Sequence, residues 1–143
     1  MMQLTLAKAQ TIITAALAHS REKSLAPMAV VVLDARGVLK AYAAEEGTAL
    51  RRADIAIGKA HGALSMGVGS RTLGQRAAER PHFIAAVTHA VGGSLIPVPG
   101  GVLIRGDDNS IIGAVGVTGD SSDNDEAAAL AGLSAAGLTA DPS

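Results

Sequence analysis

Residues 28–43 read MAVVVLDARGVLKAYA, and this stretch decides the fold. The apolar, β-branched run over residues 28–33 predicts a buried strand, because branched side chains favour the pleated sheet. Asp34-Ala35-Arg36-Gly37 predicts a turn in which Gly37 supplies a positive φ, and residues 38–43 form the returning strand. A β-hairpin is therefore expected.

A glycine-rich stretch over residues 98–119, VPGGVLIRGDDNSIIGAVGVTG, predicts the rest of the sheet. Short strands are expected over residues 95–98, 102–105 and 110–117. Glycines inside the last of these strands indicate a close approach of another backbone or of a ligand.

Apolar residues at helical spacing predict helices before, between and after the strands. They are expected over residues 5–23, 49–66, 72–79, 83–91 and 123–136. This order predicts an α+β fold, a small layered sandwich whose mainly antiparallel sheet is covered by helices. Residues 1–138 are expected to form a single domain, with residues 139–143 as a frayed C-terminal tail. Asp123-x-x-Glu126 is interpreted as a capping box of the last helix.

Composition excludes several classes of function. A net charge of −1, with one Tyr, one Phe and no Trp, leaves neither a basic surface nor stacking platforms for nucleic acid. No cysteine is present for a disulfide or an iron–sulfur cluster. No apolar run approaches the roughly 20 residues of a membrane span, so a cytoplasmic protein is expected. Because only 17% of the residues are charged, self-association is also expected.

The start of the last predicted helix is a candidate anion site. Thr118 and Gly119 precede it, and backbone amides at a helix N-terminus can bind a carboxylate. Nearby acids could instead satisfy these amides. Their spacing does not match a calcium loop, and no metal site is predicted. The acids are Asp120, Asp123, Asp125 and Glu126.

Side chains that could bind a ligand lie on the second predicted helix. Lys59 follows Arg52 by two helical turns, so it could project into a cleft and pair with a carboxylate, or cover its own helix in solvent. His61, His82 and His89 lack the spacing of a zinc site, although haem iron needs only one or two axial ligands.

Several short motifs together resemble the GlcG/HbpS-like haem-binding family, which also resembles the C-terminal domain of PduO-type corrinoid adenosyltransferases. The resemblance covers most of the chain. The motifs are Pro27-x-Ala-Val-Val-Val-Leu-Asp34-Ala-Arg-Gly37, Ala53-x-x-Ala56-x-x-Lys59-Ala60, Pro99-Gly-Gly-Val-x-Ile104, Gly113-Ala-Val-Gly116-Val-Thr-Gly119 and Asp125-Glu126 with Ala131-Gly132.

This resemblance implies a sheet of about five strands and assembly into dimers or larger rings, octamers included. It also implies a small-molecule ligand, with haem as the expected cofactor and His61, His82 or His89 as its axial ligand. Haem binding is the function that the resemblance favours.

The alternative hypothesis is a cofactor-free lyase or isomerase that acts on a carboxylate-bearing metabolite of a catabolic pathway, aromatic metabolites included. Lys59 or Arg52 would then hold the carboxylate of the substrate. Glu126 or His61 would move protons as general acid or base. Backbone amides would stabilise developing negative charge, those of Gly100, Gly101, Thr118 and Gly119.

Overall fold

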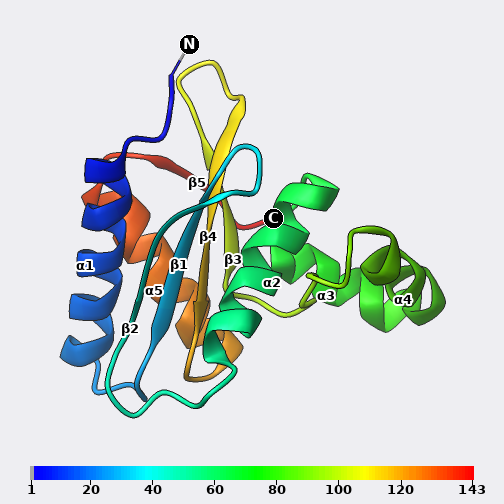
Figure 1. Cartoon of the computed structure of the whole chain (residues 1–143), viewed down its shortest axis with the longest axis horizontal. Coiled ribbons are helices and arrows are strands. Elements are labelled where there is room, and N and C mark those ends of the chain that lie inside the picture. The colour runs from blue at the N-terminus through cyan, green and yellow to red at the C-terminus, as the bar shows by residue number, and fades with distance from the viewer. Residues whose placement is uncertain (1) are drawn as a thin grey trace.

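The computed structural model describes residues 2–143, which form five helices and one five-stranded sheet (Figure 1). In chain order the elements are α1 (Leu6–Glu22), β1 (Ala29–Asp34), β2 (Leu39–Ala44), α2 (Arg52–Met66), α3 (Ser70–Glu79), α4 (Pro81–Ala90), β3 (Gly101–Arg105), β4 (Ile111–Thr118), α5 (Ser122–Ala135) and β5 (Thr139–Asp141).

The predicted hairpin forms between β1 and β2. The Asp34 carboxylate accepts hydrogen bonds from the backbone N–H groups of Arg36 (2.9 Å) and Val38 (3.1 Å). Gly37 adopts a φ of 81°, a conformation that glycine takes without steric cost. Hydrogen bonds between the Asp34 side chain and the nearby backbone therefore close the turn.

The sheet has the strand order β2-β1-β4-β3-β5, and every neighbouring pair of strands is antiparallel. The predicted α+β class and antiparallel sheet are confirmed. β1 and β4 lie inside the sheet and are almost completely buried, whereas β2 forms one edge with mostly exposed or half-buried side chains.

Helices cover the two faces of the sheet separately (Figure 1). Successive side chains of a strand point to opposite faces. Val30 and Val32 of β1 pack in the core beneath α1 and α5, while Val31 and Leu33 pack against α2 on the other face. α3 and α4 project away from the sheet and enclose a small core of their own around Leu73.

Small residues allow these layers to pack closely. A Cβ atom at Gly116 of β4 would lie 2.0 Å from the carbonyl oxygen of Ala56 in α2. A Cβ atom at Gly132 of α5 would lie 2.6 Å from the carbonyl oxygen of Ile12 in α1. Both distances are too short for real atoms, so the alanine- and glycine-rich composition follows from helix–sheet and helix–helix contact.

Two predicted boundaries at the C-terminal end were wrong. Residues 139–143 are not frayed, because residues 139–141 form β5 and pair with β3. Asp141 also accepts from the Arg105 guanidinium (2.9 Å), and the Gly69 N–H donates to the carbonyl oxygen of Ser143 (2.6 Å). The cap of α5 is Ser121 rather than Asp123, since its hydroxyl oxygen accepts from the Asn124 N–H (3.2 Å).

The expected strand over residues 95–98 was also wrong. The Ile96 N–H donates to the carbonyl oxygen of Gly58 in α2 (3.1 Å), so the segment follows a helix instead of joining the sheet. Leu95 is buried in the core beneath α3 and α4. None of the helices within residues 2–143 is long and apolar enough to cross a membrane.

Candidate functional site

A buried ion pair joins the two sides of the sheet near the C-terminal end of β4. Lys59 comes from α2 and Asp125 from α5, and their Nζ and Oδ2 atoms are 3.0 Å apart. Each side chain is only 2% exposed. Nζ also donates to the Val117 carbonyl oxygen (2.9 Å), and Asp125 Oδ1 accepts from the Asp120 N–H (2.9 Å). Hydrogen bonds therefore supplement the ionic attraction.

Burial opposes the charged form of both partners. It lowers the pKa of Lys59, and the nearby Arg52 guanidinium acts in the same direction, while Asp125 opposes the shift. Burial likewise raises the pKa of the Asp125 carboxyl against the attraction of Lys59. Each charge thus depends on the other being present.

The predicted ligand-binding glycines pack directly onto Lys59. Gly100 has a φ of 128°, and a Cβ atom there would lie 2.9 Å from Lys59 Nζ. A Cβ atom at Gly101 would lie 2.2 Å from the Lys59 carbonyl oxygen. The Gly101 N–H donates to Ser70 Oγ (2.7 Å). This amide therefore has a partner within the protein.

Arg52, Thr118 and Gly119 lie close to the same ion pair. Arg52 Nη1 donates to Thr118 Oγ1 (3.1 Å), and Thr118 is only 1% exposed. A Cβ atom at Gly119 would lie 2.2 Å from the Pro27 carbonyl oxygen. The structure thus gathers six predicted residues around a tightly packed centre, namely Arg52, Lys59, Gly100, Gly101, Thr118 and Gly119.

Asp120 binds amides at this end of the sheet. Its carboxylate accepts from the N–H groups of Ala26 and Ser121 and from Asn124 Nδ2, each at 2.8 Å. These hydrogen bonds, that from Ala26 above all, lower the pKa of Asp120 to about 2. A carboxylate of the protein itself therefore satisfies N–H groups from two segments at this end of the sheet.

Glu126, predicted to move protons, pairs with Arg71 of α3. Their Oε2 and Nε atoms are 3.1 Å apart, and the Glu126 side chain is 12% exposed. Arg71 also contacts Asp123, and its pKa is raised chiefly by the hydrogen bonds to Glu126. This pairing ties α3 to α5.

The three predicted histidines do not come together. His61 is half-buried on α2, with Nδ1 2.9 Å from the Ser94 carbonyl oxygen, so Nδ1 carries the hydrogen. His82 and His89 are exposed on α4. Within residues 2–143, no three His, Asp or Glu side chains gather as a metal-binding group.

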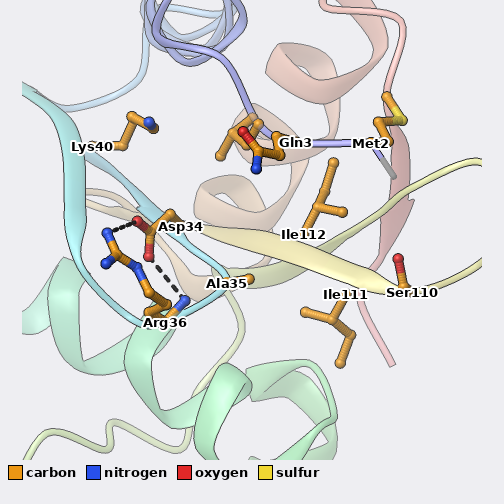
Figure 2. Close-up of a pocket in the computed structure, with 10 residues that line it drawn as sticks. Met2, Gln3, Asp34, Ala35, Arg36, Lys40, Ser110, Ile111 and Ile112 are labelled. Carbon is orange, nitrogen blue, oxygen red and sulfur yellow. Dashed lines mark hydrogen bonds and ion pairs between the residues drawn. The ribbon is translucent and has the colours of Figure 1, made fainter.

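A pocket of about 520 Å³ opens at the opposite end of the sheet, where β4 begins. The N-terminal segment, the β1–β2 hairpin and the start of β4 form its walls (Figure 2). It is lined by Met2, Gln3, Leu4, Asp34, Ala35, Arg36, Lys40, Ser110, Ile111 and Ile112. Lys59, Glu126 and the other predicted site residues are absent from this lining.

The cationic side chains occupy one side of this pocket, and on the other side Gln3 and Ser110 lie among apolar residues (Figure 2). Figure 2 shows Lys40 and Arg36 on the hairpin side, with Met2, Ile111 and Ile112 opposite them. Arg36 Nη2 is 3.1 Å from Asp34 Oδ2 and is therefore neutralised. Among the described residues, Lys40 has no carboxylate within ion-pair distance.

A second groove, of about 490 Å³, runs between α1 and β2 and also reaches Lys40. Sequence reasoning missed both cavities, because three segments distant in the chain build the first one. The only local signal is a lysine just after a tight turn.

A family model described as haem degrading protein HbpS-like matches residues 4–134. The chain belongs to the HbpS-like family. No curated protein sequence matches it.

Several solved structures share the fold of this chain. A PduOC complex with haem has a TM-score of 0.86 and 20% identity, covering 96% of this chain and 98% of its own. Protein ORFY of Klebsiella pneumoniae has a TM-score of 0.84 and 23% identity, with 96% and 93% covered. A crystal structure of HbpS has a TM-score of 0.80 and 24% identity, with 94% and 90% covered. At these identities the likeness concerns the fold.

Because the Lys59–Asp125 pair is buried, removing one charge should destabilise the protein more than removing both. Lys59→Met should lower the free energy of unfolding by about 3–5 kcal/mol, because it leaves a buried carboxylate without its cation. Adding Asp125→Asn should recover part of that loss, since no charge then remains buried. Urea denaturation measures both effects.

The exposed Arg51–Asp54 pair provides a matched control, with side chains 78% and 62% exposed. Arg51→Met should cost less than about 1 kcal/mol. Equal losses for Lys59→Met and Arg51→Met would contradict the role assigned to the buried pair.

The low pKa of Asp120 predicts that the free energy of unfolding depends on pH in the acid range. Its pKa of about 2 lies below the ordinary 3.8, so the folded state favours the charged carboxylate. The resulting stabilisation is complete above pH 4 and is lost as the pH falls towards 2. The difference in unfolding free energy between the wild type and Asp120→Asn should therefore shrink over that interval. A difference that stays constant with pH would refute the assignment.

Proposed function

We propose that this chain binds haem, or a closely related tetrapyrrole, in the pocket between its N-terminal segment, the β1–β2 hairpin and the start of β4. The observation that carries this proposal is that the pocket has its cationic side chains on one side and its large apolar side chains on the other. Membership of the HbpS-like family and the fold shared with a haem complex of PduOC support the choice of ligand.

The pocket suits a flat, amphipathic ligand. A volume of about 520 Å³ falls within the usual size range of small-molecule sites. Haem has an apolar ring and two carboxylates on one edge. Leu4 and Ile112, which belong to the same core cluster beneath α1, would contact the ring, while Lys40 would face the carboxylates.

Met2 would supply a ligand to the iron. Haem iron in proteins is held by His, Met, Cys or Tyr, and among the described residues of the lining Met2 alone is of these types. Of the predicted axial histidines, His61 packs against the β1–β2 turn. Its Cδ2 atom lies 3.4 Å from where a Cβ atom of Gly37 would be. Bound haem would supply an iron centre able to exchange small ligands or electrons.

The pocket assignment predicts a contrast between two tryptophan substitutions. Gln3 and Gln10 are both exposed, but Gln3 lines the proposed pocket and Gln10 lines the groove between α1 and β2. Gln3→Trp should weaken haem binding at least about tenfold by filling the pocket, equivalent to about 1.4 kcal/mol. Gln10→Trp should leave the affinity unchanged. Titration followed at the Soret band measures both.

Two results would overturn this proposal. Weak, non-saturating haem binding by the wild-type protein would exclude haem as the ligand. Loss of binding in Gln10→Trp, with full binding in Gln3→Trp, would place haem in the other groove. Circular dichroism of both variants checks that the fold is retained.

Replacing the proposed iron ligand should change the spectrum more than the affinity. Met2→Leu keeps the size of the side chain but removes the thioether, so the Soret band should shift while haem still binds. His89→Gln, on exposed α4, is the control and should have no effect. A shift in His61→Gln but not in Met2→Leu would instead identify His61 as the ligand.

A further inference from the structure

We propose that Lys40 selects ligands that carry a carboxylate, an inference that rests on the proposed tetrapyrrole site. The charged residues in the pocket lining are Asp34, Arg36 and Lys40. Because Asp34 and Arg36 neutralise one another at 3.1 Å, Lys40 leaves the described residues of the lining with a net charge of +1. A ligand that covers Lys40 would therefore need to supply a negative charge in place of water.

A β-bulge places Lys40 at the pocket. Leu39 is paired with Leu33 and Ala41 with Val32, so Lys40 is the extra residue of β2 where the register shifts. A bulge leaves its extra residue out of the regular pairing and redirects its side chain, and such bulges are frequent beside binding sites. The backbone of Lys40 is thus held on both sides while its side chain is free to reach a ligand.

Lys40 would disfavour neutral ligands as well as attract anionic ones. A ligand that covers Lys40 removes water from the ammonium group, and this desolvation is unfavourable unless an anion replaces the water. A carboxylate compensates for the loss, whereas a neutral ester of the same shape does not. Discrimination then arises from the uncompensated charge in the wrong complex.

Haem and haem dimethyl ester are the probes that test this inference. The wild-type protein should bind haem at least about tenfold more tightly than the ester, a ratio worth about 1.4 kcal/mol. Lys40→Met should weaken haem binding by a similar factor and leave ester binding unchanged, which removes the preference. Lys40→Arg should keep the preference, because it keeps the positive charge.

Lys23→Met is the matched control, because Lys23 is an exposed lysine that follows α1 and does not line the pocket. It should behave as the wild type. Lys40→Gln gives a second neutral variant if Lys40→Met is unstable. Raising the salt concentration should also reduce the wild-type preference, since salt screens an exposed ion pair.

The possible failures are distinguishable. Equal wild-type affinity for haem and its ester, or a preference retained in both Lys40→Met and Lys40→Gln, would refute the role of Lys40 and leave haem binding standing. Absence of saturable binding for both probes in the wild-type protein would refute the proposed function itself.

Discussion

The buried pair of Lys59 and Asp125 is the contact around which one end of this fold is organised. It connects helices from opposite faces of the sheet, and both charges are almost completely removed from water. Such a pair is stable only if the surrounding backbone supplies further hydrogen bonds and excludes solvent. The carbonyl group of Val117 and the N–H group of Asp120 supply the hydrogen bonds, while Gly100 and Gly101 let the backbone pack against the lysine.

The two ends of the sheet consequently have different characters. At the end near Lys59, polar groups are paired within the protein, and glycines bring backbone segments into direct contact. At the end where β4 begins, a pocket of about 520 Å³ is open and Lys40 lacks a carboxylate partner among the described residues. A ligand bound in this pocket would therefore not touch the Lys59–Asp125 pair.

Much of the fold could be predicted from the sequence, because the decisive signals are local. The hairpin follows from a β-branched run and an Asp-x-x-Gly turn, and the helices follow from their apolar spacing. β5 escaped prediction because it is three residues long and depends on pairing with β3 and on the Arg105–Asp141 ion pair. Residues 95–98 looked like a strand because burial alone does not say whether a helix or a sheet is the neighbour.

The candidate site was harder to predict for a related reason. The sequence identified Lys59 and Arg52 as a pair on one side of a helix, and the structure places them near one another, yet it also gives Lys59 a partner 66 positions away. The pocket could not be predicted, since the N-terminal segment meets the hairpin only in the folded chain. Roles for the predicted site residues in ligand binding or catalysis remain predictions.

The bulge at Lys40 adds a charged side chain to the pocket without changing the strand pairing on either side of it. Leu39 and Ala41 keep their partners on β1 with Lys40 inserted between them. Loss of a single codon at this position would remove the pocket's unpaired charge and restore an uninterrupted ladder. Insertion or deletion of one residue usually disrupts a strand. At this bulge such a change could add or remove a ligand preference, while the apolar side chains of the hairpin keep facing the core.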